Sequence, residues 1–161
     1  MVRNTVELMR SINDWLDEYH ESHHNPVNKI LHWICVPAIM LSLLGLMWPV
    51  KISYGDSSLS VNLAVLFILA SLAYYAFLSI PLTIGMLIVS TLMLVALYIL
   101  SGLSTPLWLI CISVFVIAWI GQFIGHHVEG RKPSFFKDVQ FLLIGPLWLL
   151  SFIYRKLGIA Y

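Results

Sequence analysis

The chain has 161 residues, of which 60% are hydrophobic and only 11% are charged, and its mean hydropathy is +0.88. Soluble domains contain about 45–50% apolar and about 25% charged residues, so the composition excludes an ordinary soluble domain and predicts an integral, multi-pass membrane protein. The net charge of +1 provides no basic stripe for a phosphate backbone, so nucleic acid is not an expected partner. We expect residues 1–161 to form one membrane-embedded domain.

The N-terminal residues 3–24 are expected to form an amphipathic helix that lies at the membrane surface. Apolar residues recur there at helical spacing, while acidic residues take the other faces. The apolar positions are Val2, Met9, Ile12, Leu16 and Tyr19. Asn25 is a typical N-cap and Pro26 a typical first helical residue, so a second helix is predicted to begin there.

Apolar stretches long enough to cross a hydrocarbon core, which needs about 20 residues, follow this helix. The stretch 61–100 is too long for one span, and Pro81 with Gly85 divides it into two helices joined by a tight turn. A polar loop is expected at 49–59. The predicted spans are residues 26–48, 61–80, 82–101 and 106–127. The cysteines inside these runs, Cys35 and Cys111, are interpreted as small core residues without a disulfide.

The last apolar segment, residues 139–154, is predicted not to span the membrane because it is short and contains Gly145 and Pro146. A re-entrant hairpin, an interfacial segment and a helix packed on the bundle all fit this pattern. The expected fold is therefore all-α. It is a polytopic membrane helical bundle with four transmembrane helices, an N-terminal amphipathic helix and a short C-terminal re-entrant or interfacial segment.

With four crossings, the Lys and Arg residues all fall on one side of the membrane except Lys51. The positive-inside rule makes that side cytoplasmic, together with both termini. The compact termini favour a bacterial inner membrane over the endoplasmic reticulum. The same side carries all the histidines, which are His20, His23, His24, His32, His126 and His127.

This gathering of histidines predicts a functional site. A single interfacial histidine is more often a structural residue, but ionisable groups at a bilayer boundary are costly and imidazole is the commonest metal ligand. His32 is expected to point into the bundle, with Asn28 one turn before it on the same face. His126 and Glu129 share a helix face, whereas His127 is turned about 100° away, so His126 is the better ligand.

The histidines favour a mononuclear metal site. HESHH at residues 20–24 matches the HxxHH box of membrane di-iron hydroxylases and desaturases, but the chain has too few histidines for two metals. Two or three histidines, with or without a carboxylate, are typical of non-haem Fe(II) oxygenases, although Zn(II) accepts the same ligands. Glu129 is equally well explained as an interfacial partner of Arg131 or Lys132.

Other function classes remain open on these residues. A bis-histidine haem protein would use His32 and His126 from two helices. A transporter or scaffold with a proton-linked network would use the histidines with Glu129, but the central stretch 61–100 carries no charge that could line a path.

Two sequence blocks resemble the signatures of a known family. HHNPVNKILHWICVP, at residues 23–37, has the spacing HxxPxNxxxHxxxxP, and QFIGHHVEGRKPS, at residues 122–134, has the spacing QFxGHxxEGRxP. Both are similar to blocks of the Mpo-like family of 2-hydroxy fatty acid dioxygenases. The resemblance extends over the whole chain and includes LLIGPLW at residues 142–148.

The resemblance implies a membrane enzyme that uses Fe(II) and O2 to shorten a long-chain 2-hydroxy fatty acid by one carbon, a step in fatty acid α-oxidation. It implies the metal ligands His23, His32 and His126, with Glu129 and Asn28 as the accompanying catalytic motif residues. The pattern does not assign His20, His24 or His127.

Substrate contacts are less well defined by the sequence. The alkyl tail needs an apolar slot between helices, for which Trp33, Trp119 and Phe123 are candidates, although aromatic residues in spans are more often packing residues. Arg131 and Lys132 could attract the substrate carboxylate. Relatives often carry a glutamate where this chain has Phe152, so a catalytically inactive relative is an alternative.

Overall fold

The computed structural model describes residues 10–53, 60–132 and 140–161. The described part is almost entirely helical, as predicted. Its elements are α1 (Ile12–His20), α2 (Pro26–Met47), β1 (Lys51–Ser53), β2 (Ser60–Asn62), α3 (Leu63–Leu78), α4 (Ile80–Ser101), α5 (Leu107–Glu129) and α6 (Phe141–Leu157). The strands β1 and β2 pair antiparallel; β1 lies in the predicted polar loop, whereas β2 lies where the predicted span 61–80 was expected to begin.

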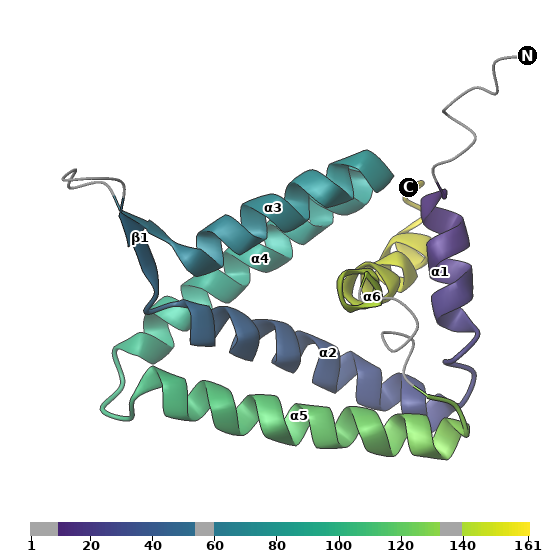
Figure 1. Cartoon of the computed structure of the whole chain (residues 1–161). Coiled ribbons are helices and arrows are strands. Elements are labelled where there is room, and N and C mark those ends of the chain that lie inside the picture. The colour runs from purple at the N-terminus through teal and green to yellow at the C-terminus, as the bar shows by residue number, and fades with distance from the viewer. Residues whose placement is uncertain (1–9, 54–59, 133–139) are drawn as a thin grey trace, which may run out of the picture.

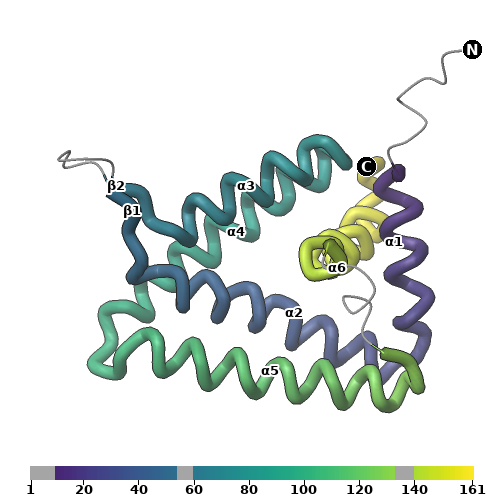
Figure 2. Tube along the Cα trace, in the orientation of Figure 1, coloured from purple at the N-terminus to yellow at the C-terminus, as the bar shows by residue number. Residues whose placement is uncertain are grey.

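The helices form two pairs with a fifth helix between them (Figure 1). Helices α2 and α5 run antiparallel along one side of the molecule, and α3 and α4 form the second antiparallel pair. The Cα trace shows that each of α3, α4 and α5 begins near the end of the molecule where the previous long helix finishes (Figure 2). Helix α6 lies between the pairs and contacts α1, α2 and α4.

Three of the described helices, α2, α4 and α5, are long and apolar enough to cross a membrane. Helix α3 is shorter than the predicted span because β2 occupies residues 60–62 and Ser79 ends the helix. Ser79 has an extended backbone and its hydroxyl accepts a hydrogen bond from the amide of Leu82, so it also starts α4.

Large apolar side chains on the helices face outward, among them Phe77, which is 81% exposed, and these surfaces suit contact with lipid.

Helix α1 is shorter than predicted and is buried on one side. Residues 3–9 of the predicted helix lie outside the described residues, and the helix ends at His20 because the chain turns there toward the Asn25 N-cap of α2. Its apolar side chains pack against α6 in the main core. These buried residues are Ile12, Trp15, Leu16 and Tyr19.

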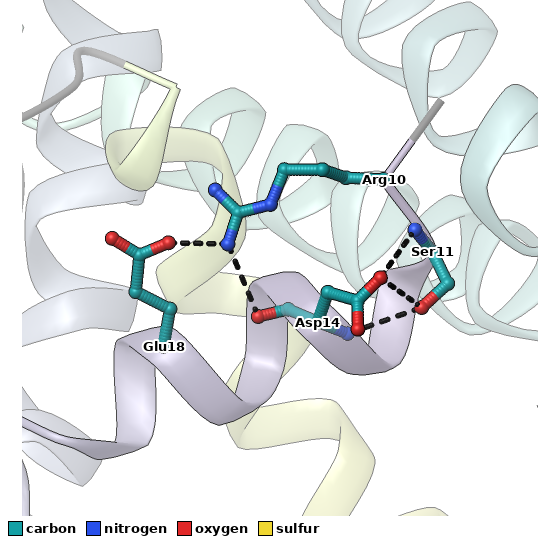
Figure 3. Close-up of polar contacts among 4 residues, drawn as sticks. All are labelled: Arg10, Ser11, Asp14 and Glu18. Atoms are coloured by element: carbon teal, nitrogen blue, oxygen red, sulfur yellow. Dashed lines mark hydrogen bonds and ion pairs between the residues drawn. The ribbon is translucent and has the colours of Figure 1, made fainter. Parts of the chain in front are cut away.

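A capping box starts α1 (Figure 3). The Ser11 hydroxyl accepts a hydrogen bond from the backbone N–H of Asp14, and the Asp14 carboxylate accepts one from the backbone N–H of Ser11. Arg10 pairs with Glu18 and lies over the Trp15 ring, 4.2 Å from its centroid. These contacts all lie within residues 10–18 and stabilise the first turns of α1.

Helix α6 is one continuous helix, so the re-entrant hairpin is wrong and the helix packed on the bundle is the correct alternative. Pro146 lies inside it and removes one backbone hydrogen bond, but nearly every side chain from Ile144 to Ser151 is buried. This packing outweighs the lost hydrogen bond. A Cβ at Gly145 would lie only 2.9 Å from the Tyr19 hydroxyl, so glycine allows α1 to approach α6 closely.

Small residues bring α2 and α5 together along their length. A Cβ at Gly121 would lie 2.6 Å from the Cys35 sulfur, and a Cβ at Gly125 would lie 2.4 Å from the Asn28 side-chain oxygen. Gly121 and Gly125 form a GxxxG pair, the pattern that lets helix backbones approach closely in membranes. Both cysteines are free and buried, as predicted.

Candidate metal centre

Three histidines meet at the end of the α2–α5 pair. His23 lies in the turn before α2, His32 lies about two turns into α2, and His126 lies in the last turn of α5. All three are buried, and each offers a ring nitrogen within 4.8 Å of those of the others. The structure therefore brings together the three residues that the sequence predicted as metal ligands.

Backbone carbonyls fix the orientation of two of these rings. The Nδ1 of His23 lies 2.5 Å from the Tyr19 carbonyl oxygen, and the Nδ1 of His32 lies 2.9 Å from the carbonyl oxygen of Asn28. A carbonyl only accepts hydrogen bonds, so each Nδ1 carries the proton and donates it. Each neutral ring then presents a lone pair on Nε2, the arrangement typical of metal-binding histidines.

The two lone pairs face each other. His23 Nε2 and His32 Nε2 are 2.9 Å apart, and neither has a proton to donate in the neutral state. Burial, followed by the charge of neighbouring His32, lowers the pKa of His23 to about 2, so protonation does not relieve the contact near neutral pH. A bound metal cation does relieve it, because both Nε2 atoms can bind the same ion.

His126 completes the group. Its Nδ1 is buried and has no hydrogen-bond partner among the residues that the structure describes. A buried ring nitrogen without a partner is unfavourable, and a metal ion would supply the missing partner. The rings of all three histidines contact one another edge to face, with centroids 4.2 to 5.0 Å apart. The donor set thus fits a metal ion held by three imidazoles.

Aromatic residues from α1 and α6 enclose the histidines. Tyr19 stacks on His23 with 4.3 Å between ring centroids, and Trp148 lies 5.0 Å from the same ring. Burial raises the pKa of the Tyr19 hydroxyl above its usual value, so the phenol stays neutral. The sequence did not identify these two residues as part of the site, because only the packing of α1 on α6 places them there.

Glu129 lies beside this group and binds the turn that carries His23. Its two carboxylate oxygens accept hydrogen bonds from the backbone N–H groups of His24 and Asn25, each at 2.9 Å. The side-chain nitrogen of Asn28 donates to the same carboxylate at 3.0 Å and to the Ser22 carbonyl at 3.1 Å. The described residues show no ion pair of Glu129 with the cations that follow α5.

The remaining histidines lie outside the three-histidine group. His24 and His127 are exposed, and His20 is partly buried beside Trp148. Burial is the main cause of the lowered pKa of His20. One group of three histidines, identified within the described ranges, agrees with a mononuclear site rather than a di-iron centre.

The chain is similar to known proteins over nearly its whole length. Residues 9–157 match the family described as 2-hydroxy-palmitic acid dioxygenase Mpo1-like. The chain is also 33% identical over 154 residues to the 2-hydroxy-palmitic acid dioxygenase MPO1 of Saccharomyces cerevisiae, a match that covers 94% of this chain and 84% of the yeast protein. The chain belongs to the Mpo1-like family. No solved structure matches it significantly.

In this Mpo1-like protein, the two sequence blocks that carry the resemblance meet at one site. The first supplies His23, Asn28 and His32, and the second supplies His126 and Glu129. The block residues therefore divide into the three histidines and a carboxylate–amide pair that ties the two blocks together.

A small cavity adjoins His126 in the Mpo1-like fold. Its volume is about 60 Å³ and its walls include Tyr19, Gln122 and Trp119. Gln122 lies one turn before His126 on α5, so the spacing in QFIGHH places both side chains on one helix face, a relation that the prediction of the site residues did not include. Of the aromatic candidates for an alkyl slot, Trp119 lines this cavity, whereas Phe123 is 48% exposed on the outer surface.

Phe152, where the resemblance led us to expect a glutamate in relatives, lies on α6. Its ring packs edge-on against Trp148 with 4.8 Å between centroids, and the guanidinium of Arg155 lies 4.8 Å from the centre of the Phe152 ring. Trp148 in turn lies 5.0 Å from the His23 ring, so Phe152 supports a residue that packs on the histidines.

Proposed function

We propose that this protein is an Fe(II)-dependent dioxygenase that shortens long-chain 2-hydroxy fatty acids by one carbon, a reaction of α-oxidation. The observation that carries the proposal is the buried His23–His32–His126 group, in which two Nε2 lone pairs face each other at 2.9 Å. Family membership supports the same reaction, since the yeast relative is named for a 2-hydroxy-palmitic acid dioxygenase activity.

The three histidines would hold the iron, and the remaining positions would bind ligands from outside the protein. Bound Fe(II) supplies the capacity to activate O2 and to chelate a 2-hydroxy acid through its carboxylate and hydroxyl. The overall reaction balances without another reductant, because one 2-hydroxy acid and one O2 give the shorter acid, CO2 and water. The carbon that leaves is the original carboxyl carbon.

Residues around the iron would act by positioning and by excluding water. The Tyr19 and Asn28 carbonyls orient the rings of His23 and His32, and Tyr19 and Trp148 cover the rings. We propose Glu129 and Asn28 as positioning residues that hold the first sequence block against the second.

The membrane arrangement is part of the proposal. Helices α2, α4 and α5 would cross the bilayer, and α3 would form a shorter fourth crossing between the β1–β2 hairpin and Ser79. With four crossings, the metal centre and the Lys and Arg residues near it lie on the cytoplasmic face by the positive-inside rule. A bacterial inner membrane remains our prediction for the location.

Metal content and turnover test this proposal together. Purified wild-type protein and the variants His126→Ala and His127→Ala would be loaded with Fe(II) without oxygen, and iron would be measured by mass spectrometry. We expect about one iron per chain in the wild type and in His127→Ala, because His127 is exposed, and loss of iron in His126→Ala. Wild-type protein without bound iron would contradict the proposal that these three histidines hold iron.

The reaction would be followed with 2-hydroxypalmitic acid labelled at its carboxyl carbon. We expect O2 uptake and release of labelled CO2 in equal amounts, both dependent on Fe(II) and both lost in His126→Ala. Bound iron without CO2 release would instead favour the catalytically inactive relative.

A bis-histidine haem protein is not favoured, because the His32 and His126 rings contact each other at 5.0 Å and leave no slot for a porphyrin.

A further inference from the structure

A large apolar cavity lies in the middle of the bundle. Its volume is about 460 Å³, within the range of about 300–1,000 Å³ that is typical of ligand pockets. Side chains from α2, α3, α4, α5 and α6 form its walls, including Phe67, Ser90 and Phe115. Its hydroxyl groups on α3 are already paired, since Ser71 donates to the Phe67 carbonyl and Tyr75 donates to the Leu143 carbonyl. The cavity therefore offers almost only apolar contacts.

This cavity adjoins the small cavity at the metal centre. The two share four lining residues, which are Ile39, Met40, Trp119 and Leu142. The small cavity, at about 60 Å³, is much smaller than the large one, so it suits a head group while the large cavity suits an alkyl chain. The combined space is polar beside His126 and apolar away from it.

Gln122 provides a donor at the polar end. The side chain lines the small cavity and is 6% exposed, and its amide nitrogen has no hydrogen-bond partner in the described part of the chain. A buried donor without a partner is destabilising by about 1–3 kcal/mol. Because Gln122 and His126 are separated by one helical turn, a ligand that bonds to this amide also lies beside the metal ligand.

We propose that the two cavities together bind one 2-hydroxy fatty acid, with a head-group oxygen accepting a hydrogen bond from the Gln122 amide and the alkyl tail lying in the large cavity. The inference rests on the proposed function for the identity of the ligand. Its physical basis is the sequence of surroundings: the three histidines come first, the buried Gln122 amide lies beside them, and the large apolar cavity (the chamber) follows. A longer tail then fills more of the large cavity.

Chain-length preference tests the position of the tail. Ser90 is buried in the chamber wall and Thr91, the next residue, is exposed on the outside of α4, so Ser90→Phe and Thr91→Phe form a matched pair. We expect Ser90→Phe to lower kcat/KM for 2-hydroxypalmitic acid at least about tenfold relative to 2-hydroxydecanoic acid, and Thr91→Phe to leave the ratio unchanged. A folded Ser90→Phe variant with the wild-type ratio would overturn the inference.

Photolabelling of wild-type protein tests the same position without a variant that could misfold and without turnover. A 2-hydroxy fatty acid with a diazirine at the end of its tail would be bound in lipid nanodiscs, and labelled residues would be mapped by mass spectrometry. We expect labels on chamber residues of α3 and α4 that an excess of unlabelled 2-hydroxypalmitic acid removes. Labels restricted to outward residues such as Tyr98, unaffected by competition, would overturn the inference.

Photolabelling and the CO2-release assay together separate this inference from the proposed function. Competed labelling of the chamber without CO2 release would support the binding site and contradict the dioxygenase activity. CO2 release with labels only on the outer surface would support the activity and contradict the binding site.

Gln122→Leu tests the head-group contact. We expect the KM for 2-hydroxypalmitic acid to rise about tenfold or more, with kcat and iron content close to wild type, because the amide contacts the substrate and not the metal. A variant with an unchanged KM would remove Gln122 from the binding site, and a merely structural role would lower iron content and kcat instead.

Discussion

Glu129 illustrates how a carboxylate can matter for a metal site without belonging to its histidine group. Its oxygens accept hydrogen bonds from His24, Asn25 and Asn28, which lie in and just after the turn that carries His23. The carboxylate therefore sets the position of one proposed ligand from the end of α5, the helix that carries another. Substitution should disturb the His23 ring without removing any metal-binding atom.

We expect Glu129→Gln to weaken metal binding by on the order of tenfold, as is typical when a residue that orients a ligand is changed. The glutamine NH2 would face N–H donors and could not accept from them. Glu21→Gln is the matched control, because Glu21 is an exposed glutamate near the same turn. Titration with Co(II), followed by its absorption spectrum, measures the affinities, and equal values for both variants would contradict the positioning role.

At the residue scale, the histidines were predictable and their surroundings were not. Asn25 and Pro26 at the start of α2 predicted where His32 lies on its helix, and the helix begins there in the structure. The spacing from His126 to Glu129 predicted a shared face, and both residues lie in the last turn of α5. Tyr19 and Trp148 could not be placed, because their contacts with His23 depend on how α1 packs on α6. Such packing between distant segments leaves no periodic signal in one sequence.

At the element scale, the α2–α5 pair determines the site because it carries His32 and His126 on facing helices. The close approach depends on small residues at the contact, above all Gly125 against the Asn28 side chain. The GxxxG pair was visible in the sequence, but nothing in the sequence identified which helix it would face.

Gly125→Ala should separate these helices. The new Cβ would lie 2.4 Å from the Asn28 side-chain oxygen, and overpacking of this kind destabilises proteins by about 1–3 kcal/mol. Gly102→Ala is the control, because its Cβ would meet its nearest neighbour, the Ile99 carbonyl oxygen, at 3.4 Å. Thermal unfolding in detergent measures the difference. If Gly125→Ala were as stable as Gly102→Ala and bound metal normally, close helix contact would not support the site.

Helix α6 shows where sequence reasoning about elements fails. Gly145 and Pro146 are typical of a break, and in isolation they would weaken a helix. The structure keeps the helix whole because Gly145 admits the Tyr19 hydroxyl and the residues that follow are buried. Tertiary packing therefore keeps this segment helical, although its local sequence predicts a turn.

At the scale of the whole molecule, hydropathy predicted the fold class and the order of the long helices, and the observed bounds of α2, α4 and α5 lie close to the predicted ones. The β1–β2 hairpin and the shorter α3 were not predicted, because an apolar strand residue such as Val61 cannot be distinguished from the start of a helix by hydropathy alone. The two cavities arise from the arrangement of all six helices, and the sequence did not predict their position.

Metal binding should stabilise the entire fold, because the three histidines connect the turn before α2, helix α2 and helix α5. At a free metal concentration of about 100 times Kd, the free energy of unfolding should rise by about 2.7 kcal/mol. Thermal unfolding with Zn(II), which has no redox chemistry, measures this shift in the wild type and in His126→Ala. Equal shifts in both proteins would mean that the metal binds elsewhere.

The distance along the chain between the histidines also determines when the site can form during biosynthesis. His23 and His32 leave the ribosome early, whereas His126 follows only after α3, α4 and nearly all of α5 have been made. Iron captured before that point would have only two of its three imidazoles. On the proposed function, complete loading would therefore wait until α5 has been inserted beside α2, and a truncated nascent chain would lack one of the three imidazoles.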